Sequence, residues 1–388
     1  MTAPKLFAQL ASLAIVATVV GLVGGSTAAA GSAKESADTP QLQLPAPTGT
    51  QPIATATLYL RDRTRRDPLA PTRTRRRLVV QLWYPTATAS GSHTAYMSPG
   101  IASPLEAAFE LPHGTFSFAT AASKAGPIAR GRHPLLLLSH GLGTLREFST
   151  ALAGDLASRG YVVAAISHTY DAAAVEFANG RVIQGTAPVE PTERQRALLL
   201  RTRLADVRFV LDNLLKRARA RTGLLARRID RDKVGALGHS LGGATASAAM
   251  LSDSRIRAGV DLDGSVFGPV VAKGLGRPFM LLVGDHGGEL TADQAQFFDR
   301  LRSKRYALTL RGAGHYSFTD LPLFAAALPG LNEAFEIGTI DPLRADRILR
   351  IYVAAFFAES LLHRPQTLLR APSTAYPEVR FVGVNGKR

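Results

Sequence analysis

Residues 238–243 read Gly238-His239-Ser240-Leu241-Gly242-Gly243 and separate two segments of different pattern. The preceding run, Val234 to Leu237, has the apolar character of a buried strand, and the following run, Ala244 to Leu251, is compatible with a helix. A serine on such a strand-to-helix turn is strained. Glycines are needed two positions to either side of it, because a side chain there would collide with the tightly folded backbone. The stretch therefore predicts an exposed serine at the N-terminus of a helix.

On both sides of this turn, short β-branched or leucine-rich runs alternate with amphipathic helical stretches. This pattern is typical of the α/β class, with a mostly parallel sheet covered by helices on both faces. Two long helices are predicted, one from about Pro191 to Arg219 and one opening at Asp341-Pro342 and running to about Leu362. Eight strands are expected, and the candidates are Thr55 to Leu60, Leu78 to Tyr84, Leu135 to Ser139, Tyr161 to Ser167, Val234 to Leu237, Ala258 to Leu262, Phe279 to Val283 and Tyr306 to Leu310.

The N-terminal residues indicate export. Lys5 precedes an apolar run from Leu10 to Val23 and then a run of small residues, so residues 1–30 are predicted to be a signal peptide cleaved after Ala30 or nearby. An uncleaved membrane anchor is the alternative. We expect the protein to be secreted or to reside in the periplasm or cell envelope.

Composition predicts the organisation of the remainder. Residues 31–52 are rich in Ser, Thr, Pro, Gln and Ala and are predicted to form a flexible linker. Residues 53–388 are long enough for a single catalytic domain with one large core. Within that domain, residues 86–132 show no steady period. We expect them to form an irregular insertion that walls or covers a pocket.

Charge and cysteine content limit the partners. The 388-residue chain contains no cysteine, which excludes disulfides, a thiolate nucleophile and cysteine metal ligands. It carries 46 basic and 30 acidic residues, and arginines cluster at residues 61–66, 73–77 and 217–221. Such a surface favours an anionic membrane or cell-envelope partner, with an ordinary solvated face as the alternative. No nucleic-acid-binding motif is present, and we expect a monomer.

The turn at Ser240 matches the nucleophile elbow of the α/β-hydrolase fold. A serine hydroxyl needs a histidine to accept its proton, and in this fold the histidine follows the serine in the chain. His315 comes just after the last predicted strand, where the sheet's carboxyl edge would bring it to the same rim as Ser240. His286 and His363 are weaker candidates for the base.

The acid that orients the histidine should lie at a strand end between these two residues. Asp263 ends the run Ala258 to Gly264, and Asp285 follows Phe279 to Gly284. Both are candidates on the pattern alone.

An oxyanion hole needs two backbone amides. One should come from Leu241, the residue after the serine, and the other from the loop after an earlier strand. The run Leu135 to Ser139 continues as His140-Gly141-Leu142-Gly143. Leu142 is therefore the predicted second donor.

These residues together resemble the platelet-activating factor acetylhydrolase family of α/β hydrolases. The likeness covers about residues 77–362 and is carried by Ser139 to Gly143, Leu152 to His168, Asp206 to Leu211 and Gly238 to Ala244. The resemblance implies that Asp263 rather than Asp285 is the acid, with His315 as base and Leu142 and Leu241 as oxyanion donors. It also implies hydrolysis of short or oxidised acyl chains on phospholipids and related small esters, without a metal or cofactor.

The predicted function is that of a serine esterase with lipase-like or acetylhydrolase-like activity on an ester or lipid substrate. Three alternatives remain. Secreted polyester hydrolases share the elbow and the export signal, and there the acid would be Asp285; an amidase would use the same machinery. A non-catalytic cell-envelope binding protein with a hydrolase fold is the alternative of another class.

Overall fold

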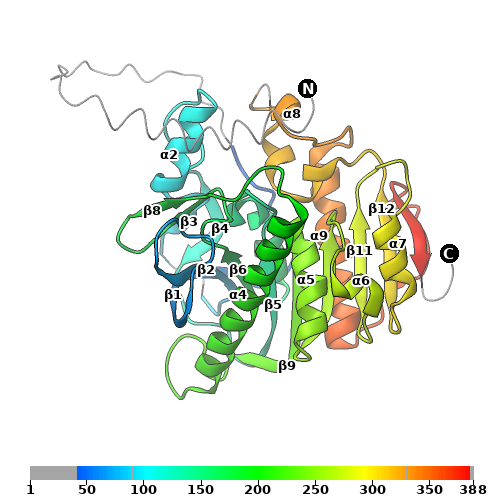
Figure 1. Cartoon of the computed structure of the whole chain (residues 1–388), viewed down its shortest axis with the longest axis horizontal. Coiled ribbons are helices and arrows are strands. Elements are labelled where there is room, and N and C mark those ends of the chain that lie inside the picture. Colours follow the sequence, from blue (N-terminus) through cyan, green and yellow to red (C-terminus); the bar gives the residue numbers. More distant parts are fainter. Residues whose placement is uncertain (1–41, 89–90, 329–330, 385–388) are drawn as a thin grey trace.

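The computed structural model describes residues 42–88, 91–328 and 331–384 (Figure 1). The predicted signal peptide and the first part of the predicted linker lie outside the described residues. Within the described residues, no helix is long and apolar enough to cross a membrane.

A mostly parallel sheet forms the centre of the molecule. Its eleven strands follow the order β13-β12-β11-β10-β9-β5-β6-β2-β1-β4-β3. The six central strands are parallel: β5 (His133–Ser139), β6 (Val162–Ser167), β9 (Ile229–His239), β10 (Ile256–Leu262), β11 (Phe279–Val283) and β12 (Arg305–Leu310). Antiparallel pairing brings β2 (Arg75–Pro85) and β1 (Ile53–Arg66) to one side of them and β13 (Val379–Val384) to the other.

The α/β class is confirmed, and all eight predicted strands are present. The strand number was underestimated, because β3 (His93–Ala95) and β4 (Ala119–Lys124) are short and β13 is an edge strand near the chain end. Three-residue strands such as β3, or β7 (Ala174–Glu176) and β8 (Val182–Gln184) in a separate hairpin, are too short to show an alternating pattern.

Helices cover both faces of the sheet (Figure 1). On one face lie α4 (Glu193–Arg219), α5 (Leu241–Ser252), α6 (Pro269–Lys273) and α7 (Ala292–Asp299), and on the other lie α3 (Thr150–Ser158) and α9 (Pro342–Leu362). Each layer buries its own apolar cluster against the sheet. Both long helices are as predicted: a capping box at Thr192 opens α4, and Asp341 caps α9, whose first residue is Pro342.

Residues 86–132 are more regular than expected. They contain β3, α2 (Pro99–Ala108) and β4, and the apolar residues of α2 pack with Tyr96, Phe116 and Phe324. The prediction was wrong because α2 is short and carries an internal proline, which obscures the helical period. The other short elements are α8 (Leu331–Ala334) and the 3₁₀ turns η1 (Arg146–Ser149), η2 (His315–Phe318), η3 (Leu321–Phe324) and η4 (Thr367–Leu369).

The described end of the predicted linker, residues 42–52, packs on the domain instead of being flexible. Thr48 donates to Asp155 Oδ1 from its amide (2.7 Å) and its hydroxyl (2.6 Å), and the amide of Gln51 donates to the carbonyl of Ser158 (3.0 Å). Composition alone misled here, because Ser, Thr and Pro are typical of linkers but also form ordered, hydrogen-bonded extended segments.

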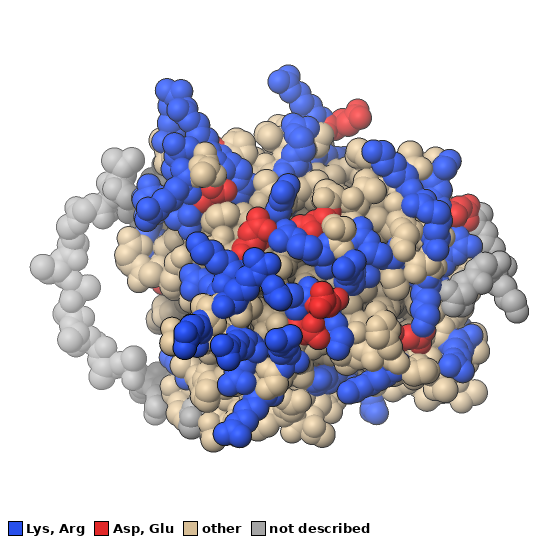
Figure 2. All heavy atoms as spheres, turned by 90° about the horizontal axis from the view of Figure 1, so that it is seen from below, with Lys and Arg blue, Asp and Glu red and all other residues tan. Residues whose placement is uncertain are grey.

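The two edges of the sheet present different segments. The carboxyl ends of the parallel strands and the loops that follow them lie towards the top of Figure 1, near α2 and α8. The connections that enter the strands lie at the amino-terminal edge, at the bottom of that view, and Figure 2 looks at the molecule from this side.

Candidate active site

Ser240 occupies a strained turn between β9 and α5. Its backbone has φ 55° and ψ −122°, a conformation that few non-glycine residues adopt. A Cβ atom added to Gly238 or Gly242 would lie only 2.4 or 2.1 Å from the carbonyl oxygen of Ser139. The backbone therefore folds against β5 as tightly as the sequence predicted, and Ser240 stands partly exposed at the carboxyl edge of the sheet.

His315 and Asp263 meet at this edge. His315 opens η2 after β12, and Asp263 follows β10 in a left-handed conformation with φ 53°. His315 Nδ1 donates to Asp263 Oδ2 at 2.6 Å, and the amide of Gly284 donates to Asp263 Oδ1 at 2.7 Å. Because Nδ1 carries the hydrogen for this bond, Nε2 is the ring nitrogen that can accept a proton.

A second histidine shares the same carboxylate. His286 Nε2 lies 3.0 Å from both oxygens of Asp263. Burial alone would raise the pKa of Asp263, but hydrogen bonds from His286 and His315 outweigh it and hold that pKa below its ordinary value. The hydrogen bond to Asp263 raises the pKa of His286 against a smaller effect of burial. The sequence analysis considered His286 only as a candidate base. Its position just after β11, the strand next to β10, could have indicated that it contacts Asp263.

The other candidates lie apart from His315. Asp285 is exposed, and its Oδ2 accepts from the amide of Gly312 at 3.0 Å. His363 ends α9 at the opposite edge of the sheet. The structure thus brings His315 together with Asp263, and it does not pair His315 with the rival Asp285.

The two predicted oxyanion donors are available. Among the described residues, no protein acceptor takes a hydrogen bond from the amide of Leu142 or Leu241, whereas the amide of Gly143 donates to the carbonyl of Asp171 at 3.1 Å. A Cβ atom on Gly141 would lie 3.4 Å from Ser240 Cβ, so this loop lies directly against the serine. Both amides can therefore serve a ligand oxygen beside Ser240.

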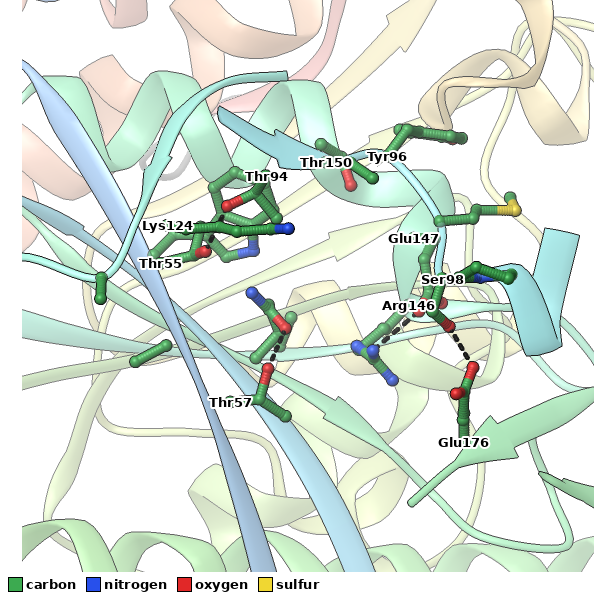
Figure 3. Close-up of a pocket in the computed structure, with 18 of the residues that line it drawn as sticks. Thr55, Thr57, Thr94, Tyr96, Ser98, Lys124, Arg146, Glu147, Thr150 and Glu176 are labelled. Atoms are coloured by element: carbon green, nitrogen blue, oxygen red, sulfur yellow. Dashed lines mark hydrogen bonds and ion pairs between the residues drawn. The ribbon is translucent and has the colours of Figure 1, made fainter. Parts of the chain in front are cut away.

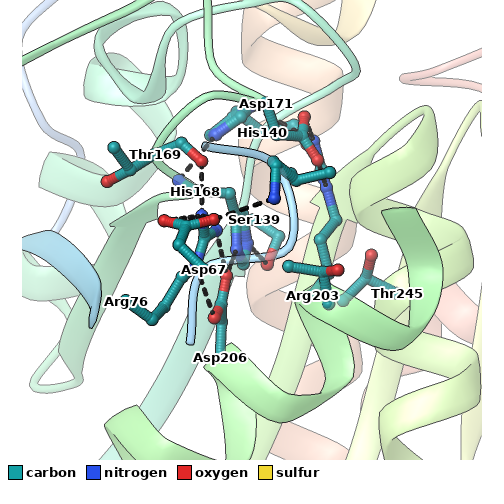
Figure 4. Close-up of polar contacts among 12 residues, drawn as sticks. Asp67, Arg76, Ser139, His140, His168, Thr169, Asp171, Arg203, Asp206 and Thr245 are labelled. Atoms are coloured by element: carbon teal, nitrogen blue, oxygen red, sulfur yellow. Dashed lines mark hydrogen bonds and ion pairs between the residues drawn. The ribbon is translucent and has the colours of Figure 1, made fainter. Parts of the chain in front are cut away.

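A buried arginine holds the Leu142 loop from behind (Figure 4). Arg203 of α4 donates to the carbonyls of His140 (2.5 Å) and Gly141 (3.0 Å) and forms an ion pair with Asp171. In a trans peptide the C=O and N–H groups point in opposite directions. Fixing the Gly141 carbonyl on Arg203 therefore turns the amide of Leu142 away from α4. Sequence reasoning missed Arg203, which is fully buried although arginines are usually exposed.

A second network lies at the carboxyl ends of β5 and β6 (Figure 4). Ser139 Oγ is 3.1 Å from His168 Nε2, and His168 Nδ1 donates to Asp206 Oδ2 at 2.9 Å. Arg76 pairs with the same carboxylate at 2.6 Å. Burial would raise the pKa of Asp206, but Arg76 and His168 hold it below its ordinary value. Burial lowers the pKa of His168, which favours the neutral ring.

One cavity is lined by residues of the 86–132 segment alone, and two others lie between that segment and the rest of the domain. The larger, about 600 Å³, lies between β1, β2, η1 and that segment, and its polar lining includes Lys124, Arg146, Glu147 and Glu176 (Figure 3). Neither Ser240, Asp263 nor His315 lines it. A smaller cavity, about 40 Å³, includes Gly143 in its lining. We take the smaller cavity as the one beside the site, since Gly143 adjoins the Leu142 amide.

The part of the chain that the structure describes contains no cluster of three His, Asp or Glu side chains arranged to hold a metal ion.

The sheet order and the strained turn after β9 define the class of the protein, the α/β hydrolases. Among solved structures, a ferulic acid esterase from Streptomyces cinnamoneus is 35% identical, with a TM-score of 0.78 over 88% of this chain and 100% of that chain.

Sequence comparisons identify the family. The model of platelet-activating factor acetylhydrolase, isoform II, matches residues 75–222 and 192–366. A "Probable 1-alkyl-2-acetylglycerophosphocholine esterase" of Arthroderma benhamiae is 30% identical over 267 residues, which is 64% of this chain and 66% of the relative. A platelet-activating factor acetylhydrolase of Canis lupus familiaris is 27% identical over 249 residues, 55% and 54% of the two chains. These matches span about half to two thirds of the relatives' length. The chain belongs to the platelet-activating factor acetylhydrolase, isoform II, family, which confirms the resemblance found in its motifs.

Proposed function

We propose that this chain is a serine carboxylic-ester hydrolase that acts through an acyl-enzyme on short-chain or phospholipid-type esters. Three features meet at one rim of the sheet and carry the proposal: the strained Ser240, the 2.6 Å His315–Asp263 contact, and two backbone amides that have no protein acceptor among the described residues. The family and the printed names of the relatives support the same activity.

Each residue has a definite task in this reaction. Ser240 Oγ attacks the ester carbonyl while His315 Nε2 takes its proton, and the amides of Leu142 and Leu241 stabilise the oxyanion. The imidazolium then protonates the leaving alcohol. In the second half, His315 activates water, which attacks the acyl carbonyl, and the proton returns to Ser240 as the acid is released.

Asp263 orients His315 and stabilises its charged form. The lowered pKa of Asp263 supports this role, because an ionised carboxylate is present to stabilise His315 while that histidine carries the proton taken from Ser240.

The smaller cavity supports a short acyl or alcohol group. Apart from Gln184 and Gly143 its lining is apolar: Ile101, Pro104, Leu105, Leu145, Phe148, Ala173, Ala174 and Val182. At about 40 Å³ it has room for a few heavy atoms, not for a long acyl chain.

Hydrolysis of p-nitrophenyl esters from acetate to palmitate tests the proposal. We expect turnover to fall with chain length, and Leu105→Ala to extend the accepted length by widening the cavity, with Leu343→Ala, at an exposed position, as the control. Preference for palmitate in the unmodified protein would contradict the short-chain assignment. Faster hydrolysis of a matched amide would make the enzyme an amidase, and failure of a fluorophosphonate to label it would favour the non-catalytic binding protein.

The Streptomyces neighbour favours a second candidate substrate, a hydroxycinnamate ester. Competition between methyl ferulate and an acetylated glycerophosphocholine ether in one assay separates the two. The higher kcat/KM identifies the substrate class.

We also propose export through residues 1–30. N-terminal sequencing of the protein recovered outside the cytoplasm should begin at or near Gly31. An intact N-terminus would indicate the membrane anchor instead.

A further inference from the structure

The positive charge of the domain is concentrated at the sheet edge opposite the active site. Seven segments enter the parallel strands or end α9 at this edge: 130–132, 159–161, 216–233, 253–257, 273–278, 299–305 and 363–366. Together they contain 20 of the 42 lysines and arginines of the described residues but only 4 of the 28 acidic residues. We call this surface the amino-edge face, and it is the side seen in Figure 2, where Lys and Arg predominate.

The rest of the described domain is nearly neutral. It has 22 basic and 24 acidic residues, so the excess charge of the domain belongs to the amino-edge face alone. None of the 20 basic side chains on this face is buried. Arg217, Arg219, Arg221 and Arg231 are exposed and have no acidic partner among the described residues. Their charges therefore act outwards, on whatever lies against this face.

The amino-edge face is broad. It follows the ends of six neighbouring strands, β6-β5-β9-β10-β11-β12, which at ordinary strand spacing extend about 24 Å. The exposed large apolar residues of the described chain are Tyr59 and Leu343, and neither lies in the seven segments. The face thus has neither an aromatic platform on which bases could stack nor an apolar wedge that could insert into a bilayer core.

We propose that the amino-edge face docks the protein on the surface of a bilayer that contains anionic phospholipids. Attraction between many unpaired arginines and a negative lipid surface needs no insertion and acts over about a Debye length. Because Ser240 and His315 lie at the opposite edge of the sheet, the docked protein holds its active site away from the lipid and open to esters arriving from solution. This inference goes beyond the proposed function and does not depend on it, since docking requires no catalysis.

Co-sedimentation with vesicles tests the docking. We expect the full chain to bind vesicles of phosphatidylcholine mixed with phosphatidylglycerol and to be released by salt. Phosphatidylcholine vesicles measure any binding by the apolar N-terminus. Salt-insensitive binding, or equal binding to both kinds of vesicle, would overturn the proposal.

A matched pair of variants tests the face. Replacing Arg217, Arg219, Arg221 and Arg231 with Gln should weaken binding to the anionic vesicles at least about tenfold. The control replaces Arg61, Arg63, Arg66 and Arg73 with Gln, four exposed arginines outside the seven segments. It removes the same charge and should keep most of the binding. Equal losses in the two variants would mean that net charge and not this face binds the lipid.

The orientation of the docked protein can be measured separately. Because the chain has no cysteine, one introduced cysteine can be labelled at a single position. A dye on Thr222→Cys, in the amino-edge face, should be quenched by a quencher attached to lipid headgroups, whereas a dye on Glu289→Cys, in the loop after β11, should not. The reverse pattern would overturn the orientation. Tighter binding to a DNA duplex than to the anionic vesicles at the same salt would assign the face to nucleic acid and overturn the lipid proposal.

Discussion

Two sets of serine, histidine and aspartate occur in this domain, and the serines of both lie at the carboxyl ends of neighbouring strands, β5 and β9. In the first, the rim set, His315 contacts Asp263 at 2.6 Å beside Ser240. In the second, the buried set, His168 contacts Asp206 at 2.9 Å and Ser139 at 3.1 Å. By residue type the two sets are the same. They differ in backbone, exposure and neighbours.

The differences explain why only the rim set is proposed for chemistry. Ser240 sits on a strained turn and is partly exposed next to two free amides, whereas Ser139 is the last residue of a regular strand and only 3% exposed. Asp206 is neutralised by Arg76, so the buried set is a closed structural network. Side-chain identity and hydrogen bonds do not suffice for a nucleophile; access and oxyanion donors are also required.

Exchanging the two serines for alanine is the strongest test of this difference. Ser240→Ala should lower kcat by about 10⁶-fold, since the attacking atom is lost, and Ser139→Ala should change it less than about threefold. Steady-state assays with p-nitrophenyl acetate measure both. A comparable loss in Ser139→Ala would show that the buried set takes part in the chemistry.

Replacing Asp263 should affect activity, whereas replacing Asp206 should affect stability. Asp263→Asn should reduce kcat by about 10⁴-fold in a protein of normal stability, because His315 loses its orientation and the partner of its charged form. Asp206→Asn should instead lower the free energy of unfolding by about 3 kcal/mol, because the charge of buried Arg76 loses a partner. Urea unfolding and kcat per fluorophosphonate-titrated site separate the two effects. Asp285→Asn is the control and should leave both quantities unchanged; loss of activity there would restore Asp285 as the acid.

Arg203 holds the loop that carries the Leu142 amide, and its replacement should have an intermediate effect. Arg203→Lys keeps the charge but cannot hold both carbonyls and Asp171, so the Leu142 amide loses its orientation. We expect kcat to fall about 10²-fold with little change in KM, and affinity for a trifluoromethyl ketone, whose adduct carries the oxyanion, to fall in parallel.

The control for Arg203 is Arg208→Lys, at an exposed position on the same helix. A rise in KM at constant kcat, or a fall only in the fraction of titratable sites, would assign Arg203 a purely structural role.

The smallest effect is expected at His286. Its pKa is raised in the folded protein, so its contact with Asp263 contributes stability that is fully present below the unfolded value of about 6.5 and is lost as pH rises through the folded value. The stability difference between the wild type and His286→Gln should therefore be largest in acid and disappear in alkali, with activity at neutral pH within about threefold. Urea unfolding across this pH range provides the measurement. A difference that grows with pH would contradict the proposed contact.

Most of the fold could be predicted from local sequence patterns. The eight predicted strands and the helices at 193–219 and 342–362 were recognisable because each has a clear period and, for the helices, a capping signal. The short strands, α2 and the packed segment 42–52 were missed, because their order depends on contacts such as Thr48 with Asp155, which lie far apart in the chain. The same holds for Arg203 and for the second contact of Asp263, with His286.

The sequence by itself determined the α/β class, the turn at Ser240, the family, and the candidates Leu142, Leu241 and His315. These follow from glycine placement, periodicity and motif order, which are local properties. The family resemblance favoured Asp263 over Asp285, and the tertiary structure shows Asp263 in contact with His315. Only the tertiary structure decided that Arg203 supports the oxyanion loop, and that the basic residues of seven separate segments share one face. Those outcomes depend on which strands become neighbours and in which direction they run, and that order is fixed by packing of the whole sheet.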